Sequence, residues 1–237
     1  MTIKQFLYQS VLLILTLQGM CVAHDYPGLL CVIEGMDGAG KTTLLQNLKL
    51  KFTQTNLPIT FTKEPGATEL GKHLRQILND RIVPVSTKAE FLLFASDRAE
   101  HFDKEIIPDL KQGKIIVSDR MADSSVAYQG YLKGLDIEMI KTVNAWCMHS
   151  IIPDLVIYLR ITPNQAKQRI ELNRGFATAF EQEFINRLDI LFHGFEQIFQ
   201  SKPNAIIIDA LQDPEEIATI VFEMIQQKFL AKSHATH

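Results

Sequence analysis

The sequence predicts an α/β fold in which a parallel sheet of about five strands carries helices on both faces. Short, continuous apolar runs alternate along the chain with longer segments whose apolar residues have helical spacing. Strands that are apolar throughout are typical of parallel sheets buried on both faces. The composition, 46% hydrophobic and 22% charged over 237 residues, is that of a globular chain long enough to bury a sizeable core.

Five segments are expected to be strands, because each is a compact run of apolar or β-branched residues. The first ends at a glycine-rich loop, and the third is followed by an Asp-Arg pair. Ligands of parallel sheets bind at the carboxyl ends of the strands, so both junctions are candidate binding positions. In chain order the expected strands are 29–34, 59–62, 114–118, 155–159 and 205–208.

Helical patterns follow the strands, as the crossover connections of a parallel sheet require. The first begins directly at the glycine-rich loop, which places a helix N-terminus beside a strand end. Another long stretch between the second and third strands contains a helical pattern of apolar residues. The expected helical segments are 41–53, 87–111, 163–173, 181–200 and 214–229.

Charge and cysteine content exclude several classes of protein. The net charge is only −3 and no long basic run is present, so the sequence has no electrostatic surface for a nucleic-acid polymer. The cysteines Cys21, Cys31 and Cys147 form no C-x-x-C pair. An odd count without such a pair disfavours a disulfide framework and a zinc site.

The first residues form an unusual segment. Residues 5–23 carry no charge, contain an apolar run at 11–17 and end on Ala23, a pattern similar to a signal peptide with a small residue at its cleavage point. The run is too short, and too interrupted by glutamine, for a membrane span. We therefore expect 1–24 to be an extension, either signal-like or preceding the actual start, and 25–237 to form one domain.

One motif follows the first expected strand directly. Residues 35–42 match the phosphate-loop pattern G-x-x-x-x-G-K-[ST] between a strand and a helix. Glycines let the backbone N–H groups converge on phosphate oxygens, and the helix N-terminus adds a positive partial charge. Lys41 supplies a full charge toward the β- and γ-phosphates, and the Thr42 hydroxyl suits Mg²⁺. The expected ATP-binding residues here are Gly35, Met36, Asp37, Gly38, Ala39, Gly40, Lys41, Thr42 and Thr43.

The phosphate loop belongs to a set of four stretches with a specific order and spacing. They are 34–43 (EGMDGAGKTT), 63–68 (KEPGAT), 91–98 (FLLFASDR), and 119–120 (DR) with 124–130 (SSVAYQG). Together they resemble the thymidylate kinase family, over nearly the whole chain from residue 29 onward. The resemblance implies a P-loop NTPase-type sheet with a small lid, and an enzyme that phosphorylates dTMP to dTDP with ATP and Mg²⁺.

The third and fourth stretches suggest a nucleobase site. Phe94 and Arg98 are four residues apart in an expected helix and therefore share a face. An aromatic ring can stack on a pyrimidine, although the helical pattern alone would assign Phe94 to the core. The resemblance implies that Phe94 stacks on thymine and that Arg98 contacts its O4 atom. It also implies that Tyr128 and Gln129 contact the nucleoside, where a glutamine amide suits the N3–H and O4 edge.

Phosphate and metal ligands are expected after the third strand. Asp119 there can hold Mg²⁺, and Arg120 can bind a phosphate through two hydrogen bonds. The resemblance implies that Arg120 binds the acceptor phosphate and that Asp37 accepts from the sugar 3′-hydroxyl. Lys63, which stands where the family usually has arginine, and Ser124 complete the expected substrate-binding residues.

A further cation is expected from the lid, at about 173–182. The variable positions of the phosphate loop contain no basic residue, and one lysine is too little for the charge on the transferring group. Arg174, which precedes a glycine, is the candidate lid residue, and Arg169 is expected under the adenine. Arg187 is an alternative, because the Asp-Arg pair that the family often has beyond that glycine is missing. The expected catalytic residues are Lys41, Asp119, Arg120 and Arg174.

Two other functions stay open from the sequence. A P-loop switch protein would bind nucleotide without an acceptor, but the N-K-x-D tetrad of GTP switches does not occur in the chain. A kinase for another nucleoside or nucleoside monophosphate, dUMP included, is the second alternative, because the pocket for the 5-methyl group cannot be read from a sequence.

The expected partners are ATP and dTMP, with no nucleic-acid polymer and no membrane. The resemblance implies a homodimer. We expect a cytoplasmic location, because an exported kinase would lack ATP, and Met20 is an alternative start for the chain.

Overall fold

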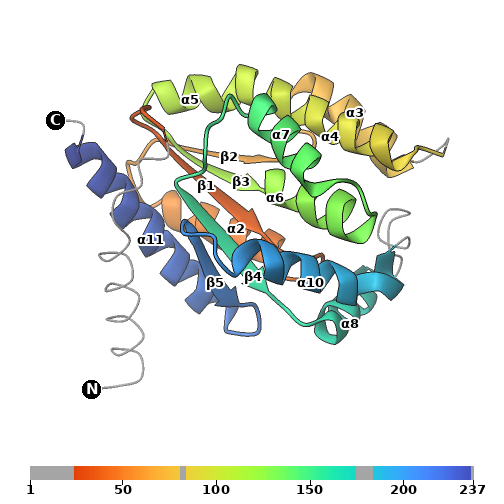
Figure 1. Ribbon diagram of the computed structural model, residues 1–237. Coiled ribbons are helices and arrows are strands. Elements are labelled where there is room, and N and C mark those ends of the chain that lie inside the picture. The colour runs from red at the N-terminus through yellow and green to blue at the C-terminus, as the bar shows by residue number, and fades with distance from the viewer. Residues whose placement is uncertain (1–23, 81–83, 175–183, 236–237) are drawn as a thin grey trace.

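The computed structural model describes residues 24–80, 84–174 and 184–235, and of these it leaves the side chains at 173–174 and 234–235 out (Figure 1). The extension at 1–23 and most of the expected lid, 175–182, therefore lie outside the described residues. The expected lid residue Arg174 is described as the last residue of a helix, without its side chain.

The expected parallel sheet is confirmed. Five strands lie in the order β2-β3-β1-β4-β5, and every neighbouring pair is parallel. The central strand is buried along its whole length, which explains why its residues before the final glutamate are all apolar. The strands are β1 (Leu29–Glu34), β2 (Ile59–Lys63), β3 (Ile115–Asp119), β4 (Leu155–Arg160) and β5 (Ala205–Asp209).

Helices connect successive strands. Those in the described residues are α2 (Lys41–Phe52), α3 (Glu69–Asp80), α4 (Thr87–His101), α5 (Ile107–Lys111), α6 (Ala122–Ser125), α7 (Ile137–Cys147), α8 (Pro163–Arg174), α10 (Leu188–Phe199) and α11 (Pro214–Ala235). Two π-helical segments, η1 (Phe102–Ile106) and η2 (Val126–Leu132), and the short 3₁₀ turn η3 (Ile185–Arg187) complete them. Helices α3 and α7 were not predicted from the sequence, although Asp136 caps α7 by accepting from the Met139 N–H at 2.8 Å.

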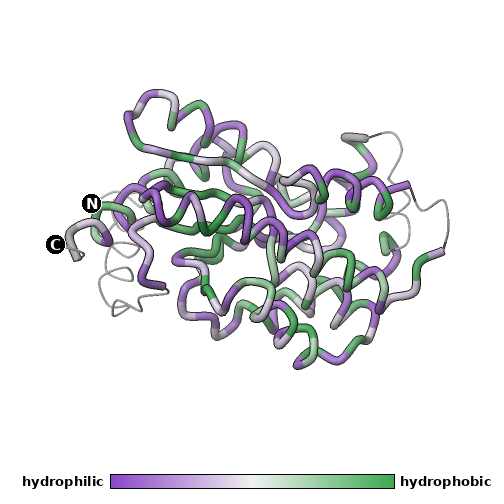
Figure 2. Tube along the Cα trace, turned by 90° about the horizontal axis from the view of Figure 1, so that it is seen from above, coloured by the Kyte–Doolittle hydropathy of each residue, from purple (hydrophilic) through white to green (hydrophobic). Residues whose placement is uncertain are grey.

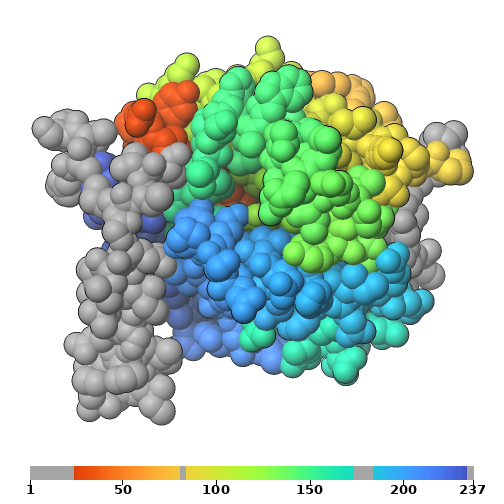
Figure 3. Space-filling model, in the orientation of Figure 1, coloured from red at the N-terminus to blue at the C-terminus, as the bar shows by residue number. Residues whose placement is uncertain are grey.

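The helices form a layer on each face of the sheet (Figure 1). On one face α2 packs against α11, where the rings of Phe52 and Phe222 lie 4.8 Å apart. On the other face α10 packs against η2, and in Figure 3 the green and blue residues of α7, η2 and α10 cover the sheet. Figure 2 shows hydrophobic stretches of the trace in the middle of the molecule.

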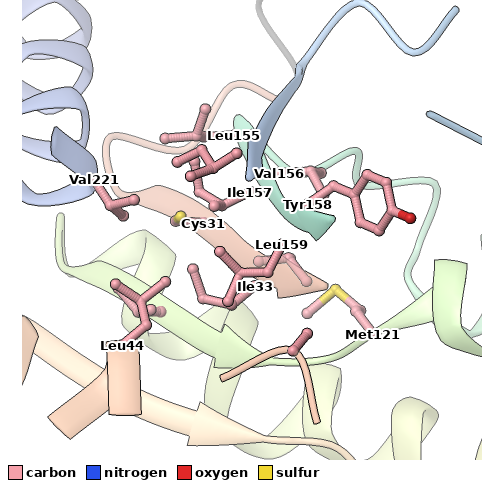
Figure 4. Packing of buried hydrophobic residues seen from close by; sticks show 14 of the residues in the cluster. Cys31, Ile33, Leu44, Met121, Leu155, Val156, Ile157, Tyr158, Leu159 and Val221 are labelled. Carbon is pink, nitrogen blue, oxygen red and sulfur yellow. The ribbon is translucent and has the colours of Figure 1, made fainter. Parts of the chain in front are cut away.

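Strand β4 shows how the core divides between the two layers. Tyr158 stacks on Phe195 and Phe199 of α10, at ring distances of 5.6 and 4.5 Å. Its neighbours Ile157 and Leu159 point to the opposite face, as Figure 4 shows. All of these side chains are buried, so both faces of the strand contribute to one core.

Other sequence expectations concern thiols and membranes. Cys31 and Cys147 are buried free cysteines, and within 24–80, 84–174 and 184–235 no cluster of metal-ligating side chains is found. Over the same ranges no helix combines the length and the apolar character that a membrane span needs.

Candidate active site

A cleft of about 600 Å³ lies at the carboxyl ends of β1, β2 and β3. All four stretches of the sequence motif contribute to its walls, although they are far apart in the chain. The expected residues that line it are Asp37, Gly38, Ala39, Gly40, Lys41, Thr42, Thr43, Lys63, Phe94, Arg98, Asp119, Arg120, Ser124, Tyr128, Gln129 and Arg169. Gly35 and Met36 are not part of the lining, and the Met36 side chain is buried in the core.

The phosphate loop connects β1 to α2. Gly38 adopts a φ of 81°, and a Cβ atom there would lie 2.8 Å from the Ala166 carbonyl oxygen, so only glycine fits. Helix α2 has no side-chain cap at Gly40 and no acidic residue in its first turn. Its first N–H groups and its positive end therefore face the cleft without a competing carboxylate on the helix, as an anion site requires.

Lys41 lies inside the phosphate loop. Its Nζ atom donates to the carbonyl oxygens of Gly35 and Met36, at 3.0 and 2.9 Å. Burial, together with the nearby Arg120 guanidinium, lowers the pKa of Lys41 to about 8. Phosphate oxygens in the cleft would reverse this shift, because an anion favours the charged form of lysine.

Arg120 joins the phosphate loop to the segment after β3. Its Nη2 atom donates to Asp37 Oδ1 at 2.7 Å, and its Nη1 atom donates to the Gly35 carbonyl oxygen at 2.9 Å. The Tyr128 hydroxyl donates to the other carboxylate oxygen of Asp37 at 2.8 Å. Burial alone would raise the pKa of Asp37, but Arg120 and Lys41 outweigh burial and lower it to about 2. Asp37 is thus a fixed anion between two cations.

Thr42 and Asp119 provide oxygen atoms suited to Mg²⁺. Asp119 Oδ1 is buried and, among the described residues, has no hydrogen-bond partner. Such an unpaired carboxylate oxygen is costly unless a cation or water satisfies it. Thr42 is exposed at the start of α2 and lines the same cleft. The donor set, hydroxyl and carboxylate, fits a hard cation that keeps several water ligands.

Arg98 is held in a buried network that the sequence did not predict. Its Nε and Nη2 atoms both donate to Glu64 Oε2, at 2.9 and 2.8 Å. Its Nη1 atom donates to Asn144 Oδ1 at 2.6 Å and to Ser125 Oγ at 3.3 Å. His101 Nδ1 lies 3.0 Å from the other oxygen of Glu64. Four of the five guanidinium N–H bonds are engaged in this way, which fixes the plane of the group.

Phe94 and Gln129 line the cleft together with Arg98. Phe94 is half-buried rather than part of the core, and it lines the cleft together with Arg98 from α4. The Gln129 amide nitrogen donates to Glu90 Oε1 at 2.9 Å. Glu90 also accepts from Lys133 at 2.8 Å, so the amide of Gln129 has a defined orientation.

The three arginines considered for the lid occupy different places. Arg169 lines the cleft and donates to the carbonyl oxygens of Ala210 and Gly38, at 3.0 and 3.4 Å. Arg187 donates to the Leu132 carbonyl oxygen at 2.5 Å and is not among the cleft residues. Arg174 ends α8, but its side chain lies outside the described part of the chain.

Four residues of the site were missed by the sequence analysis. Arg75 lines the cleft from α3 and donates to the Pro65 carbonyl oxygen at 2.7 Å. Glu64 and Asn144 hold Arg98, and Glu34 ends β1 as a buried carboxylate. Only Glu34 had a visible signal, because a charged residue at the end of an apolar strand, beside a phosphate loop, is unusual.

Comparison with known proteins gives one consistent result. The sequence model of the thymidylate kinase family matches residues 33–221. A thymidylate kinase of Carboxydothermus hydrogenoformans is 37% identical over 80% of this chain and 93% of its own length. Thymidylate kinases of Halothermothrix orenii and Bacillus velezensis are each 35% identical over 84% of this chain, and the matches cover 97% and 96% of those proteins. Matches of this extent establish that the chain belongs to the thymidylate kinase family.

Proposed function

We propose that this chain transfers the γ-phosphoryl group of ATP to dTMP, forming ADP and dTDP for nucleotide biosynthesis. The observation that carries the proposal is one cleft that is lined both by the phosphate loop and by Phe94 and Arg98. Phosphoryl transfer needs two nucleotides held in line with cations around the moving group. An acceptor phosphate oxygen is already ionised near neutral pH, so the reaction needs no general base.

The donor nucleotide is assigned to the phosphate loop. Backbone N–H groups of residues 38–43 and the charge of Lys41 would hold the β- and γ-phosphates. Arg169 borders the cleft beside Gly40, where it would cover the adenine. Mg²⁺, bound by Thr42 and Asp119, would neutralise charge on the transferring group.

The acceptor nucleotide is assigned to the remaining residues. Arg120 and Lys63 would bind its phosphate, with Ser124 beside Arg120. Asp37 and Tyr128 would contact the deoxyribose, and the hydrogen bond between their oxygen atoms, at 2.8 Å, holds the two side chains together. The base would stack on Phe94, accept at its O4 atom from Arg98, and donate to or accept from the Gln129 amide.

The catalytic cation from the lid is assigned to Arg174. It ends α8 within the expected lid, whereas Arg187 is engaged with a backbone carbonyl and is not among the cleft residues. Arg169 is the second choice because it lines the cleft. A lid cation would act only when the lid closes on the phosphates, which restricts its effect to the transition state.

We also propose, on more general grounds, that the protein is located in the cytoplasm and forms a homodimer. ATP supply places a nucleotide kinase in the cytoplasm, and mass measurement of the native protein tests this by finding its first residue. A mature chain that begins at His24 and is found outside the cytoplasm would contradict the proposal. Sedimentation of the purified chain tests the dimer.

A coupled assay of ADP formation tests the function itself. The acceptors compared are dTMP, dUMP, dCMP, dGMP and thymidine, each with Mg-ATP. We expect ADP formation that depends on dTMP and exceeds that with the other acceptors. Slow ADP formation independent of any acceptor would instead indicate a switch protein. A preference for another of these acceptors would show that dTMP is not the substrate.

A further inference from the structure

Glu34 is a buried carboxylate at the junction of the two nucleotide sites. It is the last residue of β1 and the residue directly before the phosphate loop. Its side chain is fully buried, and none of the roles assigned above uses it. Buried carboxylates are uncommon unless their oxygen atoms are engaged by donors, so its partners indicate what it does.

In the part of the chain that the structure describes, the side-chain hydrogen-bond partners of Glu34 belong to the segment that follows Arg120. Its Oε1 atom accepts from the Met121 N–H at 2.9 Å and from the Ser124 N–H at 3.2 Å. Its Oε2 atom accepts from the Ser124 hydroxyl at 2.6 Å. Three donors from a stretch of four residues therefore converge on one carboxylate, which fixes the entry to α6 relative to β1.

Ser124 connects Glu34 to Arg120, the arginine assigned to the acceptor site. Its Oγ atom donates to Glu34 and accepts from Arg120 Nη1 at 3.1 Å. The same Nη1 atom donates to the carbonyl oxygen of Gly35, the neighbour of Glu34. Arg120 also has a φ of 70°, a left-handed conformation that costs a non-glycine residue energy and needs support from its surroundings.

The electrostatic surroundings make the charge of Glu34 adjustable near neutral pH. Burial, and then the carboxylate of Asp123, raise the pKa of Glu34 to about 7, against the opposing effects of Arg120 and of the hydrogen bonds from Ser124 and Met121. Lys41 is the other charged group that interacts with it. The ionised carboxylate accepts from all three donors as a pure acceptor, whereas protonation turns one of its oxygen atoms into a hydroxyl donor and weakens this set of hydrogen bonds.

We propose that Glu34 is a positioning residue that holds Arg120, through Ser124, in the orientation that binds the acceptor phosphate. The proposal rests on the proposed function, because it assumes that Arg120 binds dTMP. Glu34 thereby couples the phosphate loop, which begins at Gly35, to the acceptor side of the cleft. Its effect should be on acceptor affinity rather than on ATP affinity.

The Glu34→Gln variant tests this with Asp154→Asn as a matched control. Asp154 is also a buried carboxylate that accepts from a β1 backbone N–H, that of Leu30 at 2.8 Å, but near the opposite end of the strand. Glutamine keeps the shape of Glu34 but replaces one acceptor oxygen by a donor, so the Ser124 hydroxyl can no longer donate to it. We expect Glu34→Gln to raise the KM for dTMP about tenfold, as for loss of a hydrogen bond to a charged group, with the KM for ATP within about twofold. Asp154→Asn should leave both KM values within about twofold while lowering the melting temperature.

A pH profile separates positioning from a purely structural role. The ratio of kcat/KM for dTMP between the wild type and Glu34→Gln cancels the titration of the substrate. We expect this ratio to be large above pH 7 and to decline as the pH falls through about 7, where Glu34 takes up a proton. A melting temperature that falls as in Asp154→Asn, with an unchanged KM for dTMP and a flat ratio, would overturn the proposal.

Two further measurements keep the test decisive. In a double-mutant cycle, Glu34→Gln combined with Ser124→Ala should be no worse than the single variants, because both interrupt the same link. Fully additive effects would overturn the link through Ser124. If Glu34→Gln does not fold, Glu34→Asp replaces it in the same cycle and with the same expected outcomes. Failure of the proposed function is distinct, because the wild type would then form no ADP in response to dTMP.

Discussion

Replacement of Glu64 by glutamine should destabilise the fold strongly, because it leaves a buried guanidinium without its counter-ion. Arg98 and Glu64 have side chains that are each only 2% exposed, and they are joined at 2.8 Å. Glutamine is almost the same size as glutamate, so the change removes charge without opening a cavity. The affected interaction links α4 to the loop after β2, which are adjacent walls of the cleft.

The size of the effect follows from the partners that Arg98 retains. Removing one partner of a buried ion pair costs about 3–5 kcal/mol. Asn144 and Ser125 still accept from Arg98 Nη1, and the glutamine carbonyl oxygen can still accept from Nε, so we take the low end, about 3 kcal/mol. For a chain of this size that corresponds to a melting temperature lower by roughly 6–12 °C.

Thermal and urea unfolding, each followed by circular dichroism, measure this change. The control is Glu69→Gln, which removes a carboxylate from an exposed pair with Lys72 on α3. Exposed pairs contribute little to stability, so the control should unfold with the wild type. A Glu64→Gln variant that also unfolds with the wild type would refute the buried ion pair, because solvent would then have to reach Arg98.

The stability difference between the wild type and Glu64→Gln should also depend on pH, with a definite sign. Burial alone would raise the pKa of Glu64, but Arg98 and His101 outweigh burial and hold it below its ordinary value. A carboxylate with a lowered pKa in the folded state stabilises the fold above its unfolded pKa, about 4.3, and loses that contribution as the pH falls through the folded value. The stability difference between wild type and Glu64→Gln should therefore be full at pH 7 and should shrink below about pH 4. A difference that grows in acid would contradict the assignment.

Three further predictions concern catalysis. Lys41→Ala should abolish kinase activity while circular dichroism and melting temperature show a folded protein, and substantial activity would exclude the phosphate-loop assignment. Phe94→Ala should raise the KM for dTMP by about ten- to a hundredfold, for loss of a few kcal/mol of stacking and packing, with little change for ATP. Equal weakening of both substrates would indicate a core role instead. Arg174→Ala should lower kcat by roughly a hundredfold or more and leave the KM for dTMP nearly unchanged. A near-normal kcat of Arg174→Ala would remove Arg174 from the mechanism, and a large drop in kcat of Arg169→Ala or Arg187→Ala, measured beside it, would identify its replacement.

The sheet and the phosphate loop could be predicted from local sequence patterns. The strands are short runs of mostly apolar or β-branched residues, a property that depends only on neighbouring residues, and the central strand is buried along its whole length. The expected segments agree with the five observed strands to within a residue or so at their ends. Helices α3 and α7 were not predicted. In α3 the buried Leu74 and Leu78 have helical spacing that was overlooked, whereas α7 exposes the apolar residues Met139 and Trp146, which blurs its apolar face.

Some features of the cleft could likewise be predicted from the sequence, and others became visible only in the structure. The resemblance of four short stretches to one family pointed to Phe94, Arg98, Asp119 and Arg120, and all of them line one cleft. Their assigned roles stay predictions, as does that of Arg174, whose side chain lies outside the described residues. The structure adds where each group is held, and it places Arg187 on a backbone carbonyl away from the cleft.

The sequence by itself determined the phosphate loop, because that loop is closed by consecutive residues whose glycines permit the required turn. The tertiary structure alone decided how Arg98 is oriented, since its partners Glu64 and Asn144 lie 34 and 46 positions away along the chain. It likewise decided that Glu34 meets Ser124, which is 90 positions away. Such contacts form when separate strands and helices pack. A buried charged group then pairs with the donors or acceptors that this packing brings within hydrogen-bond distance.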